Sequence, residues 1–142
     1  MKHLIRAVLL LVCLATAAAA SPKATKALND FRASQGRSTV TYSETLHAAA
    51  LTHARDMVSG RFFSHTGSDG SDIAQRVSRT GYGWCRVAEN IAQGQADLAE
   101  VMTDWANSPG HRANMLLEDV TEFALVRELG NTWVMVLARS GC

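Results

Sequence analysis

The feature that most constrains the fold is a change in hydrophobic period near the end of the chain. Through most of the sequence, apolar side chains recur at intervals of three and four residues, which is the spacing of a helix buried along one face. Two β-rich runs follow, 122–129 and 132–139, and the dipeptide Gly130-Asn131 that joins them suits a tight hairpin. Because the apolar faces of the helices need a sheet to cover, the sequence predicts an α+β fold with helices on both faces of a small antiparallel sheet.

Four segments carry the helical spacing, and local signals set their ends. The predicted helices are one that contains residues 28–32 and stops at Gly36, one from the N-cap Ser43 to Gly60, one over 72–79, and one from Asp97 to about Asn107. The Pro-Gly pair at 109–110 is expected to end the last helix and to set His111 at a sharp, stiff corner. A short strand near 85–87 is expected to complete the sheet.

The first twenty residues differ from the rest and predict a secretory signal peptide. Lys2 and Arg6 precede an apolar centre, and the small residues 17–20 suit cleavage after Ala20. The uncharged run 7–22 is shorter than the roughly 20 residues that cross a bilayer as a helix, so no membrane span is expected after cleavage. The remaining residues, 21–142, are expected to form a single domain in a secreted protein, either periplasmic or extracellular.

The charge of the predicted mature chain argues against two classes of partner. Cleavage removes two of the 14 basic residues and none of the 13 acidic ones, which leaves a net charge of −1 with neutral histidine. Nucleic-acid binding requires a basic field, and an anionic membrane attracts a polybasic patch. Neither kind of partner is therefore expected.

Two cysteines, Cys85 and Cys142, remain after the predicted cleavage. In an oxidising compartment a lone pair favours a disulfide, which would tie the last residue of the chain to its middle. Two free thiols are the alternative at this point.

Three stretches combine a potentially reactive side chain with apparent turn chemistry: "FFSHTGSDGSD" with His65, "AENIAQG" with Glu89, and "SPGHRANML" with His111. Two imidazoles and a carboxylate can hold Zn²⁺ with an open position, act as general base and orienter without a metal, or form a buried polar network. The sequence alone leaves all three open. His53 lies on an apolar helix stripe and is expected in the core, whereas His47 lies off that stripe and is expected to be solvated.

The ordered set "FFSHTGSDGSD", "GYGWCRVAENIAQG", "WANSPGHRANML" and "TEFALVRELGNTWVMVLA" resembles the bacterial branch of the CAP (SCP-like) superfamily, which includes cysteine-rich secretory proteins, antigen 5 and plant pathogenesis-related proteins. The resemblance implies an α-β-α sandwich and a shallow cleft in which His65 and His111 bind a divalent metal such as zinc, with Glu89 as a third ligand or as holder of a bound water. A second acid is usual three residues after a helical tryptophan. After Trp105 this chain has Ser108 instead, which supplies no charge, and Asp104 is expected to point elsewhere.

Side chains near the motifs are expected to support the cleft. Asn90 is expected to hydrogen-bond around it, Asn114 to tie the corner at His111 to neighbouring backbone, and Arg112 to pair with an acid. Trp105, Phe62 and Phe63 are expected to lie in the core and not on a ligand-stacking surface.

Two functions follow from the resemblance. The first is a secreted CAP-domain protein, monomeric, whose cleft binds a divalent metal or a small ligand, with a lipid or a cell-surface component as other partners. The second is a metal-dependent extracellular hydrolase with zinc-activated water and Glu89 as the catalytic base. Whether the protein is an enzyme stays open, because no single chemistry generalises across the fold.

Overall fold

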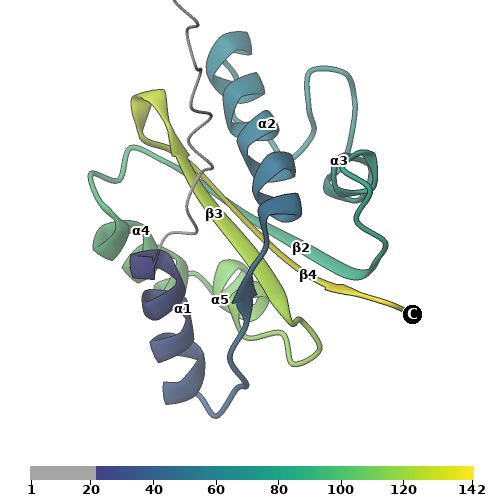
Figure 1. Ribbon diagram of the computed structural model, residues 1–142. Helices are drawn as coiled ribbons and strands as arrows, with labels where there is room; N and C mark the ends of the chain where they lie inside the picture. Colours follow the sequence, from purple (N-terminus) through teal and green to yellow (C-terminus); the bar gives the residue numbers. More distant parts are fainter. Residues whose placement is uncertain (1–21) are drawn as a thin grey trace, which may run out of the picture.

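The computed structural model describes residues 22–142, in which a four-stranded sheet lies between two layers of helices (Figure 1). The predicted signal peptide, 1–20, lies outside these residues. The helices are α1 (Pro22–Ser34), α2 (Glu44–Gly60), α3 (Ile73–Arg79), α4 (Leu98–Asn107) and α5 (Pro109–Met115), and the strands are β1 (Thr41–Tyr42), β2 (Trp84–Gln93), β3 (Glu122–Glu128) and β4 (Thr132–Ser140).

The strand order is β1-β3-β4-β2, with β3 and β2 antiparallel to β4 and β1 parallel to β3. The predicted antiparallel sheet is therefore present as β3, β4 and β2, and the short parallel strand β1 makes the whole sheet mixed. The parallel strand has only two residues, which pair Thr41 with Glu122 and Tyr42 with Phe123. A two-residue strand is too short to carry a hydrophobic period, so the sequence pattern gave no signal for it.

The predicted hairpin is present, but its loop is longer than expected. Glu128 pairs with Thr132, so three residues make the turn rather than two. Both Gly130 (φ 68°) and Asn131 (φ 54°) have left-handed backbone, a conformation that glycine and asparagine adopt at the least cost. The two residues with left-handed backbone are therefore the predicted Gly130 and Asn131, and Leu129 is the third residue of the loop.

Alternation along the strands separates two cores. Phe123, Leu125 and Met135 belong to a core with residues of α1, α4 and α5, whereas Ala124 and Val136 belong to a core with residues of α2 and α3. Because neighbouring side chains of a strand point to opposite faces, each strand serves both layers. The α-β-α sandwich is thereby confirmed, with α2 and α3 on one face and the other three helices on the opposite face.

The helix ends follow from the predicted caps, with one correction. Ser43, Asp72 and Asp97 each accept a hydrogen bond from a backbone N–H in the first turn of the following helix. Pro109 does not form a turn with Gly110, because it begins α5 as its first helical residue, where its missing N–H has no intrahelical acceptor to lose. His111 therefore lies in the first turn of a helix and not at a stiff corner.

Arg32, which the sequence showed only as a helical residue, is completely buried. Its guanidinium donates to the carbonyls of Ser38 at 2.8 Å, Met115 at 2.6 Å and Leu117 at 3.0 Å. The last two carbonyls lie at the C-terminus of α5, where a cation offsets the negative end of the helix dipole. Arg32 therefore fixes the helix that carries His111 against α1.

Cys85 and Cys142 form a disulfide, so the alternative of two free thiols was wrong. The bond attaches the end of the chain to the beginning of β2, beside an irregularity in its pairing with β4. None of the helices within residues 22–142 has the length and apolar character needed to cross a bilayer.

Candidate functional site

The candidate site forms on β2, the strand at one edge of the sheet. The structure extends this strand to Gln93, well beyond the predicted 85–87, so Glu89 and Asn90 lie on a strand and not in a turn. Their side chains point to opposite faces: Glu89 contacts Arg76 of α3, and Asn90 contacts His111 of α5. The "EN" pair thus joins the two helical layers at one point of the sheet edge.

Glu89 is the centre of a buried polar cluster. Its side chain is 2% exposed, with Oε2 at 2.8 Å from Nη2 of Arg76 and Oε1 at 2.8 Å from Nδ1 of His65. Burying a carboxylate costs free energy unless a cation or hydrogen-bond donors compensate it. The compensating cation is Arg76, itself 6% exposed, which also donates to the carbonyl of Ser71 at 2.7 Å.

Sequence reasoning did not find Arg76. Its only signal is position, since it lies beside Val77 and three residues after Ile73 on the apolar side of the predicted third helix. An arginine there is expected to extend its head to solvent unless a buried acid faces it. The acid, Glu89, is thirteen residues further along the chain and on another element.

His65 lies in the loop between α2 and α3, with 59% of its side chain exposed. The hydrogen bond to Glu89 raises its pKa above the usual 6.5, against an opposing effect of partial burial. Because Nδ1 contacts the carboxylate, Nε2 is the nitrogen left for a ligand, and it makes no hydrogen bond within the described residues, 22–142.

His111 is half-buried, and its Nδ1 lies 2.9 Å from Oγ of Ser108. Burial lowers the pKa of His111, and the charge of His65 lowers it further. Both histidines lie beside β2, because His65 contacts Glu89 and the carbonyl of His111 accepts a hydrogen bond from Asn90, although they come from opposite helical layers. Ser108, which stands where the resemblance implies an acid, here orients His111.

A hollow of about 330 Å³ adjoins His111 and has mainly apolar walls. Trp105 and Phe63 both line it. Trp105 is 1% exposed, as predicted, whereas Phe63 is 48% exposed, so its assignment to the core was wrong. Asp104 also lines the hollow, and its carboxylate accepts a hydrogen bond from Gln95 at 2.9 Å.

The asparagines of the motifs tie β2 to α5, and Asn114 bonds neighbouring backbone as expected. Asn90 donates to the carbonyl of His111 at 3.0 Å, and Asn114 donates to Oδ1 of Asn90 at 2.9 Å and to the carbonyl of Glu89 at 3.2 Å. These bonds fix the backbone that carries the site residues 89 and 111.

Arg112 pairs with no acid within the described part of the chain, and that prediction was wrong. It donates to Oε1 of Gln35 at 2.7 Å and lies over the ring of Phe31.

The comparisons with known proteins point to one family. The model of the cysteine-rich secretory protein family, CAP, matches residues 25–136. The chain belongs to the CAP family. The uncharacterized protein YkwD of Bacillus subtilis is 30% identical over 112 residues, which cover 78% of this chain and 44% of that protein.

Solved structures with this CAP fold come from several bacteria. An extracellular protein of Bacillus anthracis that contains an SCP domain superposes with a TM-score of 0.79 at 24% identity, over 83% of this chain and 39% of the other. An outer surface protein of Borrelia burgdorferi gives a TM-score of 0.76 at 21% identity, over 82% of this chain and 90% of the other. The chain thus spans less than half of two of these three relatives.

The other two histidines of the CAP domain lie outside the predicted ligand set. His53 is completely buried, as expected, with Nε2 at 2.9 Å from the carbonyl of Ser64. It also lies 3.9 Å from Oε1 of Glu89, so it borders the candidate site. His47 was predicted to be solvated, but it is half-buried, and its Nδ1 lies 2.6 Å from the hydroxyl of Tyr42.

The side chains of the candidate site do not form a three-ligand metal site as they stand. Within residues 22–142, no group of three or more His, Cys, Asp or Glu side chains is arranged to hold a metal ion. Both oxygens of Glu89 are occupied by His65 and Arg76. An imidazole that donates its N–H to a carboxylate and offers its other nitrogen outward is nevertheless the arrangement of a metal-binding histidine. The assignment of His65, His111 and Glu89 as zinc ligands stays a prediction.

Proposed function

We propose that this chain is a secreted CAP-domain protein whose cleft binds a divalent metal ion, or a small ligand in its place, through Nε2 of His65 and Nε2 of His111. One observation carries the proposal: both imidazoles have Nδ1 anchored, one on Glu89 and one on Ser108. Anchoring one nitrogen sets the orientation of the ring and leaves the other available. A pair of rings held in this way needs little reorganisation on binding.

Glu89 serves in this proposal as the holder of His65. Its carboxylate accepts the N–H of Nδ1 and makes Nε2 more basic, while Arg76 keeps the carboxylate in place. A divalent metal bound to the two rings would supply a positive charge and open positions for an oxygen-bearing ligand. Because His65 must lose its proton to bind, affinity is expected to increase as the pH rises through its pKa.

The alternative of a hydrolase with Glu89 as the general base has less support. A base must offer a carboxylate oxygen to the proton it removes. Here Oε1 accepts from His65 and Oε2 accepts from Arg76, and the side chain is 2% exposed. Binding therefore fits the geometry better than zinc-activated hydrolysis.

Secretion is part of the proposal. The titles of two structural relatives describe an extracellular protein and an outer surface protein. The predicted signal peptide and the disulfide both suit export. The monomeric state, and a lipid or cell-surface component as partner, stay predictions.

The test is isothermal titration of the purified protein with ZnCl₂. We expect one site, lost in His65→Ala and in His111→Ala, and retained in His47→Ala, the matched control that removes a histidine outside the cleft. Glu89→Gln should weaken zinc by about 10- to 100-fold, as loss of a carboxylate behind a ligating histidine does. Absence of zinc binding to the unaltered protein, or equal binding by all four variants, would contradict the proposal.

A further inference from the structure

One edge of the sheet is only partly paired. Within the described residues, β1 pairs with Glu122 and Phe123 at the beginning of β3, and the chain then turns away into α2. The rest of β3, residues 124–128, has β4 on one side and no strand on the other within that part of the chain. An open edge presents a row of backbone N–H and C=O groups to which a further strand can bond.

A backbone hydrogen bond to Phe123 shows which residues face this open edge. The carbonyl of Phe123 accepts from the N–H of Ser43, at 2.9 Å, just beyond the end of β1. Alternate residues of a strand direct their N–H and C=O groups to the same edge, so Leu125 and Arg127 direct theirs past the end of β1. Within residues 22–142 no backbone or side-chain group bonds them on that edge.

The opposite edge of the sheet is closed at the corresponding place. The outward carbonyls of Glu89 and Ile91 on β2 accept from the side chains of Asn114 at 3.2 Å and Trp105 at 3.3 Å. A strand added there would have to displace both side chains. The open part of β3 has no such cover on its backbone groups.

A hollow of about 410 Å³ follows the open edge of β3. Residues 125–127 all line it, although the side chain of Leu125 belongs to the core with α1, α4 and α5, and that of Val126 to the core with α2 and α3. A space that touches successive residues of a strand runs along its backbone edge. Leu98 of α4 and Leu51 of α2 wall this space, the β3 groove, from the two helical layers (Figure 1).

The β3 groove carries more positive than negative charge. Lys23 and Arg127 are exposed residues of its lining, and neither pairs with a carboxylate within the described part of the chain. Arg127 lies over the ring of Trp133 and bonds the side-chain oxygen of Asn131, which is uncharged. The lining includes one acid, Asp97, which accepts from a backbone N–H in the first turn of α4 at 3.0 Å. The two cations therefore favour a ligand that carries a carboxylate.

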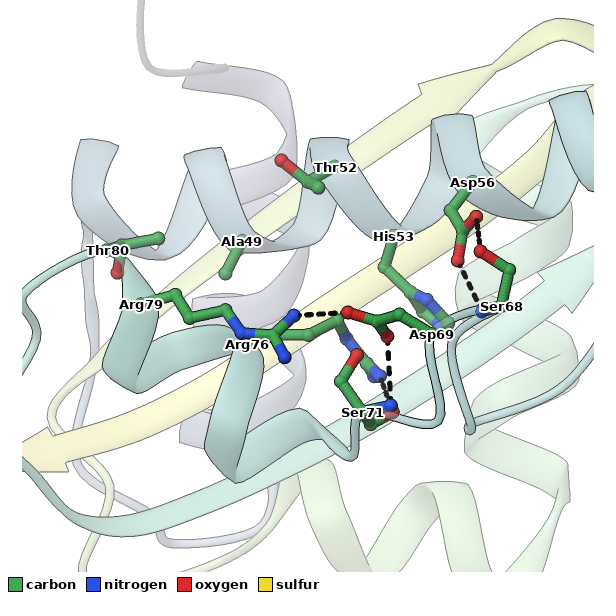
Figure 2. A pocket seen from close by; sticks show the side chains of 10 residues that line it. All are labelled: Ala49, Thr52, His53, Asp56, Ser68, Asp69, Ser71, Arg76, Arg79 and Thr80. Atoms are coloured by element: carbon green, nitrogen blue, oxygen red, sulfur yellow. Dashed lines mark hydrogen bonds and ion pairs between the residues drawn. The ribbon is translucent and has the colours of Figure 1, made fainter.

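The hollow between α2 and α3 lacks this excess of free cations. Figure 2 shows its Arg79 paired with the carboxylate of Asp69, at 2.6 Å. Its other arginine, Arg76, pairs with Glu89 at 2.8 Å. Neither guanidinium there is free for an acidic ligand.

We propose that the β3 groove binds an extended, acidic segment of another polypeptide as an added strand, which exchanges backbone hydrogen bonds with Leu125 and Arg127. Main-chain bonds supply the affinity in this mode of recognition, and pockets for alternate side chains supply the specificity. A carboxylate of the segment lies near Lys23 and Arg127. A single extended chain fits the groove better than a second copy of the domain, because helices of both layers flank the open edge and would obstruct another sheet.

This site is separate from the proposed metal site. The groove lies at β3, whereas His65 and His111 contact residues of β2 at the other edge of the sheet. Failure of zinc binding and failure of peptide binding are therefore independent results.

Amide hydrogen exchange of the free protein tests the open edge. We expect the amides of Leu125 and Arg127 to exchange faster than those of Ala124 and Val126, whose N–H groups face β4. Equal protection of all four amides would show that the edge is closed and would overturn the proposal.

The binding test is an NMR titration of the ¹⁵N-labelled protein with acetylated pentapeptides X-Thr-X-Glu-Glu, in which X is Val, Leu or Phe. We expect at least one peptide to shift the amides of Leu125 and Arg127 and to slow their exchange. The same peptide with every backbone nitrogen methylated should cause neither effect. If no peptide shifts these amides, if the methylated peptide shifts them equally, or if sodium octanoate alone does, the proposal is wrong.

A charge reversal localises the binding. Arg127→Glu is expected to weaken the peptide by about fivefold, the upper range for one exposed charge pair. Arg139→Glu is the matched control, because Arg139 is also an exposed strand residue without an acid partner in the described chain, and it does not line the groove. Zinc binding should be the same in both variants. Equal peptide affinity in the two variants would overturn the proposal.

Discussion

Replacing Glu89 by Gln tests whether the buried ion pair with Arg76 holds the candidate site together. The two side chains are 2% and 6% exposed, with 2.8 Å between the carboxylate and the guanidinium. Removing one partner leaves the other charge buried and unpaired, which typically costs about 3–5 kcal/mol. His65 cannot compensate for the change, because it too is a hydrogen-bond donor to Glu89 and supplies no negative charge to Arg76. A loss of this size is a large part of the stability of an ordinary domain.

The chain provides its own control for this measurement. Arg79, one turn after Arg76 on α3, pairs with Asp69 at 2.6 Å, and these side chains are 57% and 52% exposed. Solvent screens such a pair, so Asp69→Asn is expected to cost far less than Glu89→Gln. Urea denaturation of the disulfide-intact protein, followed by circular dichroism, measures both free energies of unfolding.

A double variant separates a buried charge from a lost contact. Exchanging both members of a buried pair for apolar residues is often neutral or stabilising. Arg76→Met combined with Glu89→Leu should therefore unfold at a higher urea concentration than Glu89→Gln alone. The reasoning is refuted if Glu89→Gln costs no more than Asp69→Asn, or if the double variant is the least stable of the three.

Three further predictions concern the disulfide, His65 and a helix cap. Cys85→Ser is expected to lower the free energy of unfolding by about 4 kcal/mol in the chain-entropy model, because the disulfide joins two cysteines that are 57 positions apart in the sequence. An unchanged urea midpoint would contradict this. By NMR, His65 should titrate above 6.5, and Glu89→Gln should lower its pKa. Folding raises the pKa of His65, so the stabilisation from its pair with Glu89 is fully present below pH 6.5 and is lost as the pH rises through the pKa of the folded state. If the wild type, but not Glu89→Gln, became more stable over that pH range, the pairing of His65 with Glu89 would be refuted. Ser43→Ala should cost about 0.5–2 kcal/mol by urea denaturation, because its hydroxyl oxygen caps α2; Ser43→Asp should restore most of that loss.

Much of the candidate site could be predicted from the sequence because its residues lie in recognisable local motifs. His65, Glu89 and His111 were all selected in this way, and the structure places Nδ1 of His65 2.8 Å from Oε1 of Glu89. Their assignment as a metal site stays a prediction. Arg76 and His53 complete the cluster, but no sequence motif identifies them. Each is an ordinary helical residue in the sequence, and its role depends on the carboxylate of Glu89, which faces it only in the folded chain. The role of Glu89 as a partner of two cations likewise depends on residues distant in the chain.

The sequence alone determined what depends on near neighbours: the helical stripes, the N-caps, the hairpin turn and the change of period that requires a sheet between helical layers. Only the tertiary structure decided what depends on pairing distant segments. It added β1 beside β3, made Pro109 the start of a helix, and placed His65 and His111 against neighbouring residues of β2. The physical reason is that caps and periodicity act within one or two turns, whereas burial and ion pairing are set by whichever groups packing brings together.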